Sequence, residues 1–107
     1  MGKYLVQGAY SVEGHKGLLK QGGSARREAI SKLVESVGGR LETVYFAFGA
    51  EDFIFIADLP DHASASAVGL NAAASGAVAS VRTTILLTPE EVDQACKKSV
   101  VYRPPTS

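Results

Sequence analysis

Six polar side chains lie within or beside apolar segments, where the fold would partly withdraw them from water. They are three tyrosines, a histidine, an acid and an arginine: Tyr4, Tyr10, His15, Tyr45, Asp52 and Arg82. A few such groups around an apolar cavity are what a small organic ligand needs. His15 is the one candidate catalytic acid or base, because an imidazole titrates near neutral pH and this one follows an apolar segment directly.

Each of the two charged candidates also has a simpler structural explanation. His15 stands in a glycine-rich stretch, so a solvated loop histidine accounts for it as well. Arg82 lies inside an apolar segment and must either reach solvent at a sheet edge or pair with an acid such as Asp52 or Asp58. A structural ion pair is the simpler interpretation of Arg82, and anion binding is the alternative.

Other kinds of site find little support in the sequence. The only histidines are His15 and His62, and no His-x-x-His or Cys-x-x-Cys occurs, so we expect no metal and no cofactor. Glu51 and Asp52 are adjacent, which in a strand would point them to opposite faces rather than pair them for acid-base catalysis. Cys96 is the only cysteine and excludes an internal disulfide, which favours a reducing, cytoplasmic setting.

Apolar patterning and turn residues predict four strands. Their side chains are mainly β-branched, aromatic or aliphatic, over Tyr4–Tyr10, Leu41–Phe48, Asp52–Leu59 and Val78–Thr88. The second and third form a hairpin, and Pro60 ends the third because proline cannot donate to a ladder. Residues 11–23 hold four glycines and are expected to form a long loop, with at most a short helical turn at His15–Lys20.

Helices are predicted between these strands and after the last one. Ser24 is expected to cap an amphipathic helix that stops at Gly38-Gly39, where glycine closes a helix without steric cost. Asp61 is expected to cap a second helix of small residues ending near Gly76, and Pro89 opens a third with acids in its first turn. The small side chains of the second helix imply either close packing on the sheet or a remaining cavity.

The order strand, helix, strand, strand, helix, strand predicts an α+β, ferredoxin-like βαββαβ fold. It has a four-stranded antiparallel sheet with two helices on one face. A chain of 107 residues forms one domain, here 1–107, with its core in 3–88 and a C-terminal helix and tail in 89–107. Apolar residues make up 46% and charged residues 21%, as in ordinary globular proteins.

The strands are apolar on both faces, although two helices can cover only one. In the third strand Phe53 and Phe55 face one way while Ile54 and Ile56 face the other. Exposing five or six large apolar side chains would forgo on the order of 10 kcal/mol. We therefore expect a homodimer through the open sheet face. The alternative is that residues 89–101 fold back over the sheet of their own chain.

Several short motifs of the chain are typical of a known protein family: Gly17, Arg26, Gly38-Gly39, the turn Gly49 to Asp52, Leu59-Pro60-Asp61, Ser75-Gly76 and Val81-Arg82-Thr83-Thr84. Over about four fifths of the chain, the sequence resembles the GYD domain family, small bacterial proteins of the dimeric α+β barrel superfamily. The signature tyrosine of the family is replaced in Gly49-Ala50-Glu51-Asp52. The resemblance implies a ferredoxin-like dimeric barrel and supplies no catalytic residues.

These observations favour a small homodimeric protein that binds a small organic molecule between sheet and helices. The resemblance also implies an alternative, a cofactor-independent isomerase, lyase or monooxygenase acting on a small aromatic or lactone-like compound. There His15 would be the acid or base and Arg82 would stabilise negative charge. A structural or stress-associated assembly protein is the third possibility. Eleven basic and eleven acidic residues balance, so neither nucleic acid nor a membrane surface is an expected partner.

Overall fold

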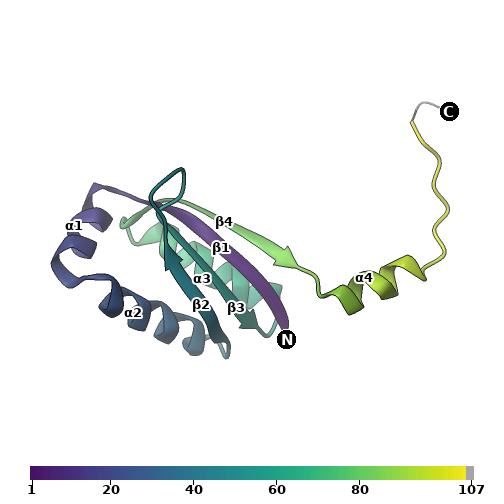
Figure 1. Cartoon of the computed structure of the whole chain (residues 1–107), viewed down its shortest axis with the longest axis horizontal. Coiled ribbons are helices and arrows are strands. Elements are labelled where there is room, and N and C mark those ends of the chain that lie inside the picture. The colour runs from purple at the N-terminus through teal and green to yellow at the C-terminus, as the bar shows by residue number, and fades with distance from the viewer. Residues whose placement is uncertain (106–107) are drawn as a thin grey trace.

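The computed structural model describes residues 1–105, which form one antiparallel sheet of four strands with helices around it (Figure 1). The elements in chain order are β1 (Gly2–Tyr10), α1 (Val12–Gln21), α2 (Gly23–Ser36), β2 (Arg40–Phe46), β3 (Phe53–Leu59), α3 (His62–Ala74), β4 (Val78–Leu86) and α4 (Pro89–Cys96). The strand order is β2-β3-β1-β4, and α2 and α3 cover the same face. This confirms the α+β, ferredoxin-like prediction. No helix within residues 1–105 has the length and apolar character to cross a membrane.

Local capping explains where the predicted helices begin and end. The Asp61 carboxylate accepts a hydrogen bond from the backbone N–H of Ser64 at 2.7 Å and so caps α3, as expected. This bond also holds the pKa of Asp61 below its usual value. After α2, Gly38 takes a φ of 83°, the left-handed conformation that glycine adopts without strain.

The segment after β1 differs from the prediction, because it forms the ten-residue helix α1 rather than a loop. The Ser11 hydroxyl caps it by accepting from the N–H of Gly14 at 3.2 Å. Glycine spacing suggested a loop, but Gly14 has a packing role: a Cβ there would lie 2.0 Å from the Ala77 carbonyl oxygen. Ser24 is not the cap of the next helix, since α2 begins at Gly23 and Gly22 occupies the cap position.

The hydrophobic core lies between the sheet and the two helices. The sheet contributes alternate residues of β1 and β3, whose phase is that expected from the sequence: Tyr4, Val6, Tyr10, Phe53, Phe55, Ala57 and Leu59. Four buried helix residues pack onto them, Ile30, Val34, Ala65 and Val68. The small helix α3 therefore contributes only one large side chain to the core, which bears on the cavities described below.

The opposite face of the sheet carries apolar side chains with no helix over them. Cross-strand pairing places Leu5 beside Ile56 and Thr84, and Tyr45 beside Ile54. Tyr45 is 70% exposed, whereas Leu5, Ile54, Ile56 and Leu86 are partly shielded by their neighbours. Burying this face would therefore gain less free energy than the earlier figure, which assumed that every side chain is fully exposed. We call these five residues the open-face cluster.

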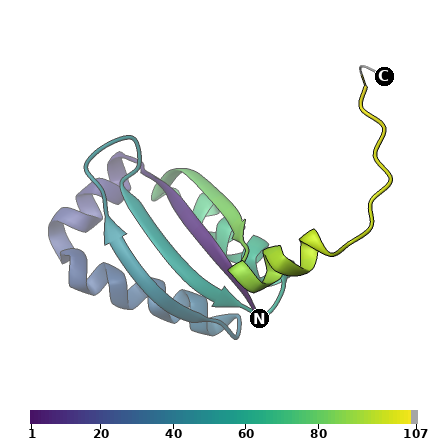
Figure 2. The same cartoon turned by 45° about the vertical axis from the view of Figure 1, so that its right-hand side comes forward.

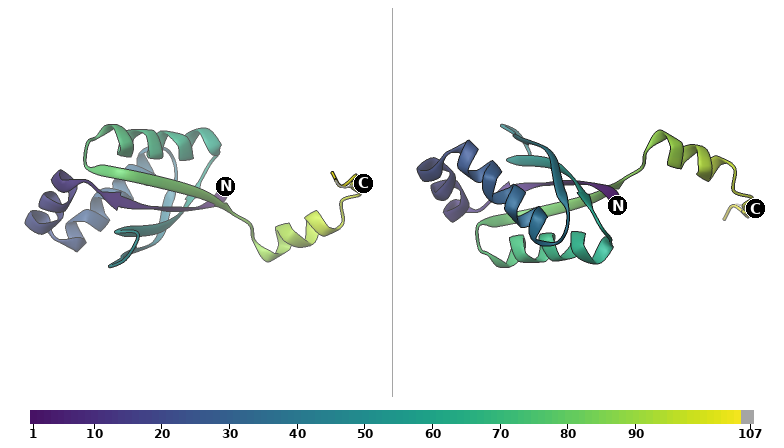
Figure 3. Two further views of the ribbon diagram at one scale, coloured as in Figure 1. Left: turned by 90° about the horizontal axis from the view of Figure 1, so that it is seen from above. Right: turned by 90° about the horizontal axis from the view of Figure 1, so that it is seen from below.

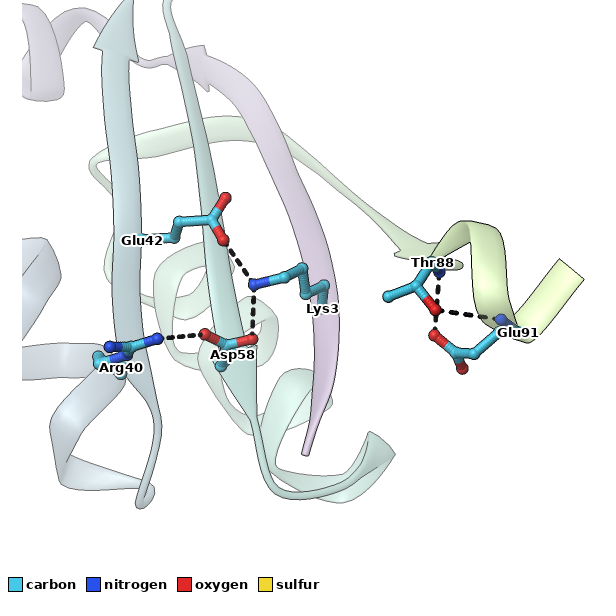
Figure 4. Close-up of polar contacts among 6 residues, drawn as sticks. All are labelled: Lys3, Arg40, Glu42, Asp58, Thr88 and Glu91. Atoms are coloured by element: carbon cyan, nitrogen blue, oxygen red, sulfur yellow. Dashed lines mark hydrogen bonds and ion pairs between the residues drawn. The ribbon is translucent and has the colours of Figure 1, made fainter.

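Ion pairs flank the open-face cluster at both ends of the sheet. At one end Lys3 pairs with Glu42 and, at 3.0 Å, with Asp58, which also pairs with Arg40 at 3.3 Å (Figure 4). The hydrogen bond from Lys3 and the second from Arg40 hold the pKa of Asp58 below its usual value. An apolar centre with a charged rim is the usual anatomy of a protein interface.

The C-terminal segment does not cover this face. Helix α4 forms as predicted, with a capping box between Thr88 and Glu91 (Figure 4), but it projects beyond the end of the sheet (Figures 1 and 2). None of its residues is buried. The alternative in which residues 89–101 pack over their own sheet is therefore wrong, because the chain turns away from the sheet after β4.

Candidate functional site

Two buried side-chain atoms without a hydrogen-bond partner lie close together, one from the end of β1 and one from the start of α2. The Tyr10 side chain points from the last residue of β1 into the helix layer and is 7% exposed. Arg26 reaches the same region from the first turn of α2. Neither the Tyr10 hydroxyl nor the Arg26 Nε has a hydrogen-bond partner among the described residues, although both atoms are buried.

Tyr10 and Arg26 separate two hollows. One is a narrow apolar chamber of about 30 Å³ between the sheet, α2 and α3, lined by Phe53, Phe55, Val68 and Gly69 among others. The other is a cleft of about 190 Å³ beneath α1, lined by Gly14, Gly17, Leu18 and Ala77 among others. Both hollows also have Tyr10 and Arg26 in their walls.

The chamber answers the question raised by the small residues of α3. At Gly69 the helix lies at an ordinary contact distance from β4, since a Cβ there would lie 4.0 Å from the Thr83 hydroxyl. The helix nevertheless leaves a hollow beside Val68, Gly69 and Ala72. The small side chains of α3 thus leave a cavity, the second of the two alternatives, and it lies on the side of the helix that faces α2.

The charges and protonation states of Tyr10 and Arg26 suit a hydrogen-bond acceptor. Burial raises the pKa of Tyr10, and Arg26 partly opposes that rise, first through its side-chain contact with the phenol oxygen and then through its charge. That contact falls short of full hydrogen-bond geometry, and the phenol remains a neutral donor at physiological pH. Arg26 takes part in none of the ion pairs found among residues 1–105. Glu13, the one acid in the cleft wall, lies 3.7 Å from Lys16 instead.

His15 and Asp52 lie beside this pair. The Asp52 carboxylate accepts the backbone N–H of Tyr10 at 2.9 Å and lies 3.5 Å from His15 Nε2. The His15 ring packs edge-on against Tyr10 with 5.9 Å between centroids, while its Nδ1 donates to the Ser11 carbonyl at 3.0 Å. Figure 2 shows the β2–β3 loop that carries Asp52 at the same end of the sheet as α1. His15 is not among the residues that line either hollow.

The remaining candidates lie elsewhere. The buried Tyr4 hydroxyl hydrogen bonds to His62 Nδ1 at 2.7 Å, in a separate groove between α3 and β4. Tyr45 belongs to the open-face cluster, and Arg82 pairs with Glu51 on the open face rather than with Asp52 or Asp58. The structure thus brings together Tyr10, His15 and Asp52, and it does not place Arg82 in a hollow with His15.

Arg26 was not among the sequence candidates, although the sequence holds a signal for it. It precedes the buried Ile30 by four residues, a spacing that places both side chains on one face of a helix. A charge at such a position must find a partner or a ligand, or reach solvent. Without the helix's orientation, however, Arg26 is indistinguishable from Arg27, which is exposed.

Comparison with known proteins agrees with this fold. A search of curated proteins gave no match. A family model described as GYD domain matches residues 4–96, from β1 through α4, and so covers the sheet, its helices and the Tyr10–Arg26 pair. The chain belongs to the GYD domain family.

Proposed function

We propose that this GYD domain is a homodimeric binding module for a small organic molecule carrying an anionic or strongly accepting oxygen group. The ligand binds beneath α1, at the wall between helices and sheet. The observation that carries the proposal is the pair of buried donors, Tyr10 Oη and Arg26 Nε, with no protein acceptor among the described residues.

An unpaired buried donor is costly, which makes the pair informative about the ligand. Each such group costs about 1 to 3 kcal/mol, and more when it is charged. Most buried polar groups in proteins are therefore paired, and an exception calls for an explanation such as a functional role, an ordered water or a bound ion. A carboxylate fits both donors at once, because its oxygens accept from a phenol and from a guanidinium. A neutral apolar ligand would leave both donors unpaired.

The two hollows limit the size and shape of this ligand. The cleft of about 190 Å³ corresponds to roughly six water molecules at liquid density. The chamber of about 30 Å³ admits only a small group unless its walls move. A short organic acid with its oxygens at Arg26 and its carbon part in the cleft matches these dimensions, and the apolar chamber provides room for a small substituent.

The dimer forms through the open-face cluster. Five large apolar side chains on one sheet face exceed what a solvated antiparallel sheet normally presents, and the flanking ion pairs form a polar rim. The surface is self-complementary across a two-fold axis, with the apolar centre of one copy facing that of the next.

Thermal-shift measurements test the ligand proposal. Small aliphatic and aromatic carboxylates are screened beside their neutral amides at equal concentration. We expect a subset of the acids to raise the melting temperature and the amides to have little effect. Arg26→Gln abolishes the shift, whereas Arg27→Gln, one residue along α2 and exposed, retains it. No stabilisation by any acid, or equal loss in both variants, contradicts the proposal.

A cofactor-independent enzyme is the second candidate, and the His15–Asp52 pair favours it. His15 Nε2 is the ring nitrogen left to accept a proton, because Nδ1 donates to Ser11, and it lies 3.5 Å from Asp52. His15 therefore acts as a base only after Nε2 turns from Asp52 towards a ligand beside Tyr10. Arg82 has no part in this version, since it pairs with Glu51. Deuterium exchange into a bound acid, followed by NMR, tests the idea. His15→Ala should abolish the exchange while leaving binding intact; exchange that persists in His15→Ala excludes His15 as the base.

A further inference from the structure

Helix α4 is well formed locally yet has no packing within its own chain. Thr88 and Glu91 form a full capping box, Pro89 occupies the first turn, and Glu90 lies near the positive end of the helix dipole. No residue of α4 is buried, however, and Val92 is 45% exposed. Because isolated helices shorter than about 12 residues are marginal in water, capping alone does not keep an eight-residue helix folded.

The segment around α4 is also apolar where a free tail would be polar. Val92, Ala95 and Cys96 follow the spacing that places side chains on one helical face. Large apolar residues flank the helix and are exposed: Leu87, Val100, Val101 and Tyr102. The match to the family model runs to residue 96, so α4 belongs to the domain itself. These features indicate a helix with a docking surface outside its own chain.

The position of α4 indicates what that surface is. Viewed along the sheet, α3 lies on one side and α4 on the other (Figure 3). Helix α4 therefore projects on the side of the open-face cluster, past the end of the sheet where Lys3 and Asp58 lie (Figure 4). A second copy stacked on that face would lie directly in its path.

We propose that α4 packs through Val92, Ala95 and Cys96 onto the second copy of this chain. Each copy thus contributes its C-terminal segment, which begins with α4 and is here called the arm, to the surface of the other. This inference rests on the proposed dimer. The acids Glu90 and Asp93 stay at the solvent side of the contact. The arm thereby extends the open-face interface, and each copy buries the apolar face of the other copy's α4.

Photo-crosslinking from Cys96 tests the contact directly. As the only cysteine, and an exposed one, it accepts a single benzophenone maleimide on the otherwise unchanged full chain. We expect irradiation to give a covalent species of twice the chain mass. The matched control is Cys96→Ser with Glu90→Cys, because position 90 faces away from Val92 and should crosslink several-fold less. Equal crosslinking from both positions, or none from Cys96, overturns the arm contact.

Val92→Glu separates the arm from the rest of the dimer. Glutamate is a better helix former than valine, so this change does not melt α4 by propensity. We expect the dimer dissociation constant from light scattering to rise tenfold or more, as it should on removal of residues 89–107, while Asp93→Asn leaves it unchanged. If the full chain is monomeric, the proposed dimer itself is wrong. If the chain is dimeric and Val92→Glu does not weaken the dimer, the sheet interface stands and the arm contact is wrong.

Discussion

Gly14 and Ala77 make the backbone contact that holds α1 against the end of the sheet. A Cβ on Gly14 would lie 2.0 Å from the Ala77 carbonyl oxygen, and the same carbonyl accepts the Ser11 N–H at 2.9 Å. The cleft beneath α1 has both Gly14 and Ala77 in its wall. The absence of a side chain at position 14 thus lets α1 lie close to Ala77 in the wall of the candidate site.

Gly14→Ala should therefore destabilise the fold and displace α1. The added methyl cannot coexist with the carbonyl, and we expect a loss of about 1 to 3 kcal/mol of unfolding free energy. Gly17→Ala, three residues along the same helix, has nothing within 4 Å and should instead stabilise by about 0.5 to 1 kcal/mol. Urea unfolding of the two variants measures the contrast. Equal effects would show that the Gly14 contact is not what positions α1.

Tyr10→Phe should affect stability and binding in opposite directions. Without ligand, removing an unpaired buried hydroxyl leaves the protein equally stable or up to about 1 kcal/mol more stable. Binding of the organic acid found by thermal shift should weaken tenfold or more, because one donor is gone. Calorimetric titration and urea unfolding give the two values. A clear loss of stability would mean that the hydroxyl already has a structural partner.

The raised pKa of Tyr10 predicts how the stability of the fold depends on pH in the alkaline range. Because burial raises the folded pKa above the ordinary value of 10.0, the unfolded chain ionises first, and the phenol imposes no ionisation cost on folding below pH 10. The free energy of unfolding then falls as the pH rises from 10 through the folded pKa. The wild type should therefore lose stability more steeply than Tyr10→Phe above pH 10, as measured by urea unfolding across a pH series. Parallel curves would contradict the burial of the phenol.

Asp58 should contribute an acid-sensitive increment of stability. Its pKa is lowered in the fold by Lys3 and Arg40, so the increment is present above the ordinary carboxyl value and is lost as the pH falls through the folded pKa. Because Lys3 is more than a third exposed, we expect only about 0.5 kcal/mol at pH 7. Asp58→Asn should be less stable than wild type at pH 7, and the difference should shrink as the pH falls to 2. An unchanged difference at both pH values would rule out the ion pairs as its source.

If the proposed dimer forms, Ile56→Lys should convert it to a folded monomer. Ile56 lies opposite Leu5 and Thr43 near the centre of the open-face cluster, where a buried unpaired charge is not tolerated. Light scattering at micromolar concentration should give the mass of one chain, with an unchanged circular dichroism spectrum. Ser36→Lys, on the exposed end of α2, is the control. A dimer that survives Ile56→Lys would place the interface elsewhere.

The fold was predictable because its signals are local. Alternation of Phe53, Ile54, Phe55 and Ile56 defines both faces of β3, and the capping role of Asp61 follows from its residue type and position. The helix α1 was missed because glycine spacing alone favours a loop. A residue without a side chain fits at position 14 because Ala77, 63 positions later in the chain, packs against it, and no local pattern reveals that contact.

The sequence by itself determined the order of the elements, the apolar phase of the central strands and the surplus of apolar side chains on the open face, because these follow from the period of each element. The tertiary structure alone decided which polar residues meet. Tyr10 and Arg26 come from different elements, and only the packing of α2 over the sheet brings their donors together and excludes water from them. It likewise paired Arg82 with Glu51, and it left α4 with no surface of its own chain to cover.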